Sequence, residues 1–275
     1  MMSIQREPDG RRSVRVETEV PGTPEQVWQA IASGPGISAW FVPTTVDGRV
    51  GGELVSDFGG GMLSTAKVTD WQPPVRFCAE SQGWAPGMPT VATEWTVEAL
   101  AGGTCRVRVV HSLFADTDDW DGQLTGTESG WPSYFRVLRR YLVAFAGQAV
   151  AQVQAMAMSE RPIADVWSEL CAAMRIGKPA PGQRFRVAIG LGVTFRGEVD
   201  RVDAQGAGGS VLANLTEPLP GTLFVGTFPC GGTMVSLQAF LYGERAAKVA
   251  AGARPVVQQW LGATFPPPAT AEGGS

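Results

Sequence analysis

A repeated order of segments constrains the fold more than any other feature of this sequence. An alternating apolar and polar stretch, Val14 to Val20, precedes the short segment TPEQVWQAI, which begins at Thr23. A second extended stretch, Val153 to Met158, precedes RPIADVWSEL, which shares the proline, the Val-Trp pair and the apolar spacing of the first segment. Alternation is typical of a half-buried strand, and apolar residues three and four apart are typical of a helix. The chain therefore reads as two copies of one structural plan.

Each copy continues with strands and closes with a long helix. The first long helix is expected to open at Gly130-Trp131-Pro132 and the second at Arg254-Pro255. The predicted strands are Arg49–Ser56, Met62–Trp71, Val75–Gln82, Val91–Glu98 and Thr104–Leu113, then Phe185–Leu191, Val193–Val202, Ser210–Leu215, Thr222–Phe228 and Thr233–Tyr242. Clustered strands with helices kept apart from them predict an α+β fold with antiparallel sheets. We expect two tandem domains, 13–147 and 150–265, between disordered ends at 1–12 and 266–275.

The start of the first short helix carries a local signal of its own. Thr23 is a good N-cap, Pro24 suits the first helical position, and Gln26 stands three residues after the cap. A Thr followed at this spacing by Gln can form a capping box, in which two main-chain N–H groups are satisfied reciprocally. The helix is therefore predicted to begin at Pro24.

Charge and cysteine content exclude several classes of function. Lys and Arg number 22 against 26 Asp and Glu, and the arginines are scattered, so we expect no nucleic-acid partner. The four cysteines form no CxxC pair and the chain has one His, so we expect no structural zinc and no cofactor. Reduced thiols and a polar start without a secretory signal favour the cytoplasm. No apolar run reaches about 18 residues, so no membrane span is expected.

Three local patterns contain residue types that could carry chemistry. His111 ends an alternating stretch that begins at Cys105, so it is either a general base or polar handle in a cavity or a hydrogen-bonded core residue. The acidic stretch Asp116–Gly122 lacks the glycine and the final acid of an EF-hand, which favours a solvated loop. The glycine run 59–61 lacks the Lys of a phosphate-binding loop and favours a hairpin turn. No GxSxG motif or Cys–His pair indicates a nucleophile.

Aromatic residues are unusually frequent in the first copy. They either line an internal cavity or form a dense core, since each ring buries a large apolar area. The residues are Trp28, Trp40, Phe41, Phe58, Trp71, Phe77, Trp84, Trp95, Phe114, Trp120, Trp131, Tyr134 and Phe135.

Several of these segments, in order, resemble one family. They are Thr23–Ile31, Ile37–Phe41, Val50–Leu54, Lys67–Pro74, Glu94–Glu98, Gly102–Thr104, His111-Ser112 and Gly130–Pro132. Together they resemble the START-like (SRPBCC) proteins, and within them the heat-shock-protein-90 ATPase activator-like branch, over about residues 13–147. The second copy resembles the family more faintly and is expected to be a divergent domain.

The resemblance implies a helix-grip fold, in which a curved antiparallel sheet wraps around a long C-terminal helix and leaves an apolar cavity between them. Mapped onto this sequence, it implies that the cavity of the first domain is lined by Trp40, Phe41, Phe77, Trp95, His111, Trp131, Phe135 and Leu138. No residue is assigned as catalytic or metal-binding.

We expect non-enzymatic binding of a small hydrophobic molecule in this cavity, with His111 as the group that orients it. The enzyme alternative is a polyketide cyclase or aromatase-like activity with His111 as the acid or base. A third alternative is a co-chaperone-like module that binds a protein through the second domain or the loop 116–121. The sequence identifies neither the ligand nor a protein partner.

Overall fold

The structure is a computed structural model of the whole chain. It describes residues 5–6, 11–81, 89–114, 121–205 and 208–266. The chain divides into two compact units, Met1–Ala146 and Gly147–Ser275, which we call the first and second domain.

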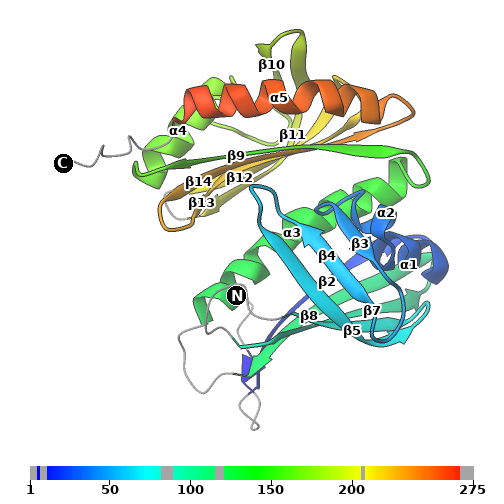
Figure 1. Cartoon of the computed structure of the whole chain (residues 1–275). Coiled ribbons are helices and arrows are strands. Elements are labelled where there is room, and N and C mark those ends of the chain that lie inside the picture. The colour runs from blue at the N-terminus through cyan, green and yellow to red at the C-terminus, as the bar shows by residue number, and fades with distance from the viewer. Residues whose placement is uncertain (1–4, 7–10, 82–88, 115–120, 206–207, 267–275) are drawn as a thin grey trace. The chain divides into compact units, whose positions relative to one another are not determined.

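The first domain contains one antiparallel sheet of eight strands. Its order is β1-β2-β8-β7-β6-β5-β4-β3, so neighbours in the chain are mostly neighbours in the sheet (Figure 1). The strands are β1 (Gln5–Arg6), β2 (Arg11–Pro21), β3 (Thr44–Val46), β4 (Glu53–Asp57), β5 (Leu63–Gln72), β6 (Arg76–Ser81), β7 (Val91–Leu100) and β8 (Thr104–Phe114). The central strands alternate buried and exposed residues, as a sheet with one covered face requires.

Three helices complete the first domain. The short helices α1 (Pro24–Ala32) and α2 (Gly34–Ile37) lie in the connection between β2 and β3, and the long helix α3 (Asp121–Ala144) packs along β2. The capping box predicted for α1 is confirmed, because the Thr23 side chain accepts from the Gln26 N–H and the Gln26 side chain accepts from the Thr23 N–H. This cap fixes where the chain leaves β2 and enters the helix.

The second domain repeats the plan with fewer elements. Its six-stranded antiparallel sheet has the order β10-β11-β12-β13-β14-β9. The elements are β9 (Val150–Ser159), α4 (Ile163–Ala173), β10 (Arg184–Gly190), β11 (Val193–Gln205), β12 (Gly208–Glu217), β13 (Gly221–Pro229), β14 (Thr233–Tyr242) and α5 (Ala246–Thr264). The helix α5 packs along β9 through small buried residues, among them Ala246, Ala250 and Ala253. Because the side chains on this face of the helix are small, α5 can lie close to the sheet and pack tightly against it.

The expected fold class is therefore confirmed: each domain is an antiparallel sheet gripping a long C-terminal helix. Several boundaries differ. Arg11 and Arg12, expected in a disordered end, begin β2, and residues 5–6 form β1. The long helices begin at Asp121 and Ala246, well before the expected openings, so Pro132 and Pro255 lie inside them.

The helix prediction placed each proline at the first turn, where its missing N–H costs nothing. Inside a helix a proline removes a main-chain hydrogen bond, which packing elsewhere on the helix can offset. Because α3 begins earlier than expected, the end of the acidic stretch is helical and does not belong to a loop. Asp121 and Gly122 belong to α3, and residues 116–120 lie outside the described part of the chain.

Candidate functional site

Close packing of α2 on α1 positions the first two residues of the predicted site. A Cβ on Gly36 would lie 1.9 Å from the Gln29 carbonyl oxygen, so only glycine allows this approach. Trp40 and Phe41 follow α2 in a turn, and the Trp40 Nε1–H donates to the Ala30 carbonyl oxygen at 2.8 Å. The buried Trp40 ring is thereby fixed to α1 and directed at the sheet.

Strands and the long helix supply the other rings. Trp95 lies on β7, and Trp131 and Phe135 lie one helical turn apart on α3. The centroid of Trp40 is 6.0 Å from that of Trp95 and 6.4 Å from that of Trp131, and Trp95 meets Trp131 edge to face at 5.2 Å. Such separations and angles are favourable for aromatic pairs. The structure therefore brings these predicted residues together in one group, which we call the ring cluster (Trp40, Phe41, Trp95, Trp131 and Phe135).

The rings of the ring cluster contact one another directly. Phe135 lies within 6.5 Å of Trp40, Trp95 and Trp131, centroid to centroid. Four of the five rings are buried, and only Phe41 is half-buried. A ligand that stacks on one of these ring faces therefore has to displace the ring that covers it.

Phe41 connects the ring cluster to the surface. Its ring stacks on Trp131 at 5.2 Å with an interplanar angle of 23°, and it meets Tyr134 edge to face at 4.7 Å. On the other side it contacts Phe58, which is 40% exposed at the tip of the β4–β5 hairpin. The same hairpin exposes Met62 and Leu63, and glycines with positive φ at 59–61 form its tight turn, as predicted for this run. Apolar rings therefore continue from the core to solvent along this path.

His111 is joined to the ring cluster by a hydrogen bond from Trp131. The Trp131 Nε1–H donates to His111 Nε2 at 2.8 Å, and the two rings are nearly parallel, with 5.6 Å between their centroids and an interplanar angle of 18°. Because Nε2 accepts, the proton of the neutral imidazole is on Nδ1, which lies 2.9 Å from Thr93 Oγ1 and donates to it. Burial lowers the pKa of His111 to about 4, so the ring is neutral at physiological pH. Both of its nitrogens are already used within the protein.

Two predicted residues lie at the margin of this group. Phe77 on β6 stacks on Trp95 at 6.3 Å but otherwise packs on Trp28 and Trp71, away from α3. Leu138 is fully buried on α3, three residues after Phe135. Both contribute apolar surface behind the rings.

Sequence reasoning missed Thr93, and it named Tyr134 and Phe58 only among the aromatic residues of the first copy, without placing them with the predicted site residues. A signal for Thr93 was available, because a tight turn joining Leu100 to Thr104 places Thr93 opposite His111 in the antiparallel register. Burial raises the pKa of Tyr134 to about 12, so this residue adds an uncharged aromatic surface. The contact of Phe58 with Phe41 could not be predicted, since it depends on how the hairpin folds.

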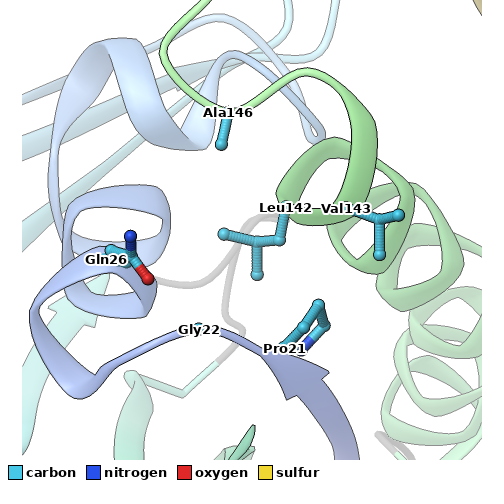
Figure 2. Close-up of a pocket in the computed structure, with 6 residues that line it drawn as sticks. All are labelled: Pro21, Gly22, Gln26, Leu142, Val143 and Ala146. Atoms are coloured by element: carbon cyan, nitrogen blue, oxygen red, sulfur yellow. The ribbon is translucent and has the colours of Figure 1, made fainter. Parts of the chain in front are cut away.

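A separate pocket of about 300 Å³ lies between the start of α1 and the last turns of α3 (Figure 2). It is lined by Pro21, Gly22, Gln26, Leu142, Val143 and Ala146. None of the predicted site residues is among them. Its lining is aliphatic, and its one long polar side chain, Gln26, is used by the capping box.

The cysteines are free, and burial suppresses the reactivity of three of them. It raises the pKa of Cys78 and Cys105, and it raises that of Cys171 to about 11. Thiols with raised pKa values are weak nucleophiles at neutral pH, because little thiolate is present. Among the described residues, no three His, Cys, Asp or Glu side chains come close enough to hold a metal ion. Within the same residues, no helix has the length and apolar character to cross a membrane.

Arginines on the outer face of the first sheet are paired with carboxylates. Arg106 lies within 4.0 Å of Glu17, Glu19 and Glu98, and Arg76 bridges to Glu94 at 2.7 Å. These pairs are partly exposed and add little stability. They do, however, balance the positive charge of this face.

The geometry defines a helix-grip protein whose first domain holds a group of aromatic rings between sheet and helix. Residues 21–143 match the family model described as activator of Hsp90 ATPase homolog 1-like protein. The match spans most of the first domain and agrees with the resemblance of its sequence to the START-like (SRPBCC) proteins. No curated protein sequence matches the chain.

Some solved structures similar to this chain match nearly all of it, and others match about half of it. The di-domain ARO/CYC BexL from the BE-7585A biosynthetic pathway is 16% identical, with 92% of this chain and 94% of that chain covered, at a TM-score of 0.43. DynU16 from the dynemicin biosynthetic locus is 17% identical, with 92% and 96% covered, at a TM-score of 0.44. Aha1 from Colwellia psychrerythraea is 22% identical, with 49% and 98% covered, at a TM-score of 0.41.

Proposed function

We propose that the first domain binds a small, planar, apolar molecule between Phe41 and Trp131. The observation that carries this proposal is the contact between these two rings, which stack nearly parallel at 5.2 Å. Trp131 is buried and hydrogen-bonded, whereas Phe41 is half-buried and lies in a turn. Phe41 is therefore the ring that can swing outward, and a flat molecule can then stack on the face of Trp131 that Phe41 leaves.

The polar groups around the ring cluster favour an uncharged ligand. The indole N–H groups of Trp40 and Trp131 donate to protein acceptors, and both His111 nitrogens are hydrogen-bonded. A ligand that stacks here meets ring faces rather than these donors and acceptors. Burying a charge without a partner is costly, so the ligand we propose is neutral and bound through apolar area.

The expected affinity follows from area. A fused-ring molecule that buries about 300 Å² of apolar surface gains about 7 kcal/mol at about 25 cal/mol per Å². Exposing Phe41 costs about 1 to 2 kcal/mol, which is comparable to the burial of such a side chain. The loss of translational and rotational freedom on binding lowers this gain further, so we expect a dissociation constant no tighter than tens of micromolar.

Binding without catalysis fits the state of His111. As an acid or base in a cyclase-like reaction, it would first have to break its bond to Trp131 or to Thr93. Its lowered pKa also leaves it without a proton to give from Nε2 at neutral pH. We therefore propose a binding protein, acting in the cytoplasm, where free thiols such as its own four cysteines persist.

The test is a titration of the full chain with N-phenyl-1-naphthylamine, a neutral fused-ring fluorophore whose emission rises on leaving water. We expect saturable binding, and about tenfold weaker binding by Trp131→Leu, which removes the fixed ring face. Trp260→Leu is the matched control, because Trp260 is a half-buried tryptophan of the second domain. Thermal unfolding checks that both variants are folded.

Two results would overturn the proposal. One is the absence of saturable binding to the unaltered chain. The other is equal affinity of the folded Trp131→Leu and Trp260→Leu variants, because binding would then lie elsewhere.

A further inference from the structure

The long helix of the first domain has a weak point beside the site. Pro132 lies inside α3 and follows Trp131 directly. A proline has no N–H, so the carbonyl four residues earlier loses its helical donor, and the ring crowds that carbonyl. Helices commonly kink at such positions. At this level, side-chain contacts with the sheet must contribute to holding the helix.

Trp131 makes such a contact through a relay of three elements. Trp131 on α3 donates to His111 on β8, and His111 donates in turn to Thr93 on β7. Thr93 and His111 are also partners in the β7–β8 ladder, so the acceptor for Trp131 is held by the sheet itself. The relay fixes the rotation of the indole as well as its distance from the sheet.

The orientation of the indole decides which surface the site presents. The same Trp131 ring stacks on Phe41 at an interplanar angle of 23° and meets Trp95 at 85°. If the indole rotated about its Cβ–Cγ bond, the stacking with Phe41 and the edge contact with Trp95 would be lost together. A fixed indole therefore presents one flat face toward Phe41.

We infer that His111 is a positioning residue, which holds the Trp131 indole as the fixed wall of the ligand site. The inference rests on the proposed function and adds to it a division of roles: Trp131 is fixed, Phe41 moves, and His111 acts through Trp131 without touching the ligand. A preformed wall raises affinity, because the ligand does not have to order the ring itself.

The second domain provides an internal comparison. There too the residue before the helix-interior proline reaches the sheet, because Arg254 Nε–H donates to the Gln152 carbonyl oxygen on β9 at 2.9 Å. This bond ends on a main-chain carbonyl and no aromatic ring is positioned by it. Arg254 therefore serves as a control for the loss of a helix-to-sheet bond without the loss of a positioned ring.

The experiment compares His111→Leu, which removes the acceptor, with His111→Gln, whose amide oxygen can accept from the indole. Two readouts are used: the solvent exchange rate of the Trp131 indole proton by NMR, assigned with Trp131→Phe, and the affinity for N-phenyl-1-naphthylamine. We expect fast exchange and about tenfold weaker binding in His111→Leu, and recovery of both in His111→Gln. Arg254→Leu should change neither.

The outcomes separate the two proposals. If the unaltered chain does not bind the probe, the proposed function fails. If it binds, and folded His111→Leu keeps both the slow exchange and the affinity, the positioning role is wrong and the proposed function stands. If His111→Gln behaves as His111→Leu does while remaining folded, the hydrogen bond is not what positions the ring, and the inference is again overturned.

Discussion

Acidification tests the environment of His111 directly, because it is the only histidine in the chain. Burial lowers its pKa from 6.5 to about 4. The unfolded chain therefore takes up a proton at His111 below about pH 6.5, whereas the folded chain resists it until about pH 4. The folded pKa lies below the unfolded one, so the stability associated with neutral His111 is complete above pH 6.5 and is lost as the pH falls toward 4.

The size of the effect follows from these two values. Linkage gives a loss of about 2 kcal/mol in the free energy of unfolding between pH 7 and pH 5, and about 3 kcal/mol once both states are protonated. A solvent-exposed histidine would contribute nothing, because its pKa would be the same in both states.

The groups around His111 are consistent with a lowered pKa. Desolvation by burial is the cause of the lowered pKa of His111, and Arg12 is buried on the same face of β2 as Val14, the ladder partner of His111. Thr93 on β7 is uncharged, and the raised pKa of Tyr134 on α3 keeps that residue neutral throughout this pH range.

The assay is urea unfolding of the unaltered chain and of His111→Gln at pH 7 and pH 5. Tryptophan fluorescence reports mainly on the first domain, because Trp167 and Trp260 are the only two of the nine tryptophans that lie in the second. Carboxylates titrate alike in both proteins, so their contribution cancels. The unaltered chain should lose about 2 kcal/mol more than His111→Gln on acidification. Equal losses would refute the reasoning, since they would mean that folded His111 accepts a proton without cost.

Three further substitutions test the packing that builds the domains, each by urea unfolding. Trp40→Phe removes the donor to the Ala30 carbonyl and should lower the free energy of unfolding by about 1 to 3 kcal/mol. Trp260→Phe should lower it by a negligible amount, and equal losses would show that this hydrogen bond is unimportant. Thr23→Ala removes the capping box and should cost about 1 kcal/mol, and no change would mean that the cap is satisfied by water. Ala250→Leu should overpack α5 against β9 and lower the free energy of unfolding of the second domain by about 1 to 3 kcal/mol, with the first domain unaffected. A stabilised variant would reveal unfilled space between α5 and β9.

The repeated pattern predicted the architecture well because strands and their turns are local features. Alternation and glycine-rich breaks placed β5 to β8 and β10 to β14 within a few residues of their observed bounds. The starts of the long helices were not predicted, for two reasons. Residues 121–130 contain three glycines, which are poor helix formers, and the Ala-rich start of α5 precedes a proline that resembles a helix opening.

The composition of the site was largely predictable, but its packing was not. The family resemblance brought Trp40, Trp95, Trp131 and Phe135 to one place, where the structure also has them. Whether the rings surround a space or fill it depends on rotamers and on backbone shifts of an ångström or two, which no periodicity records. The hydrogen bond that His111 accepts from Trp131 could not be predicted for the same reason, because the indole comes from α3 and its position depends on how that helix packs.

An NMR titration of the full chain with N-phenyl-1-naphthylamine tests the central claim most directly, because it reports where the molecule binds. The account predicts saturable shifts of the Trp131 indole and of the Phe41 and Tyr134 signals, with the amides of α4 and α5 unchanged. Saturable shifts confined to Leu142 and Val143, which line the separate pocket, would contradict it, as would a spectrum that the probe does not alter.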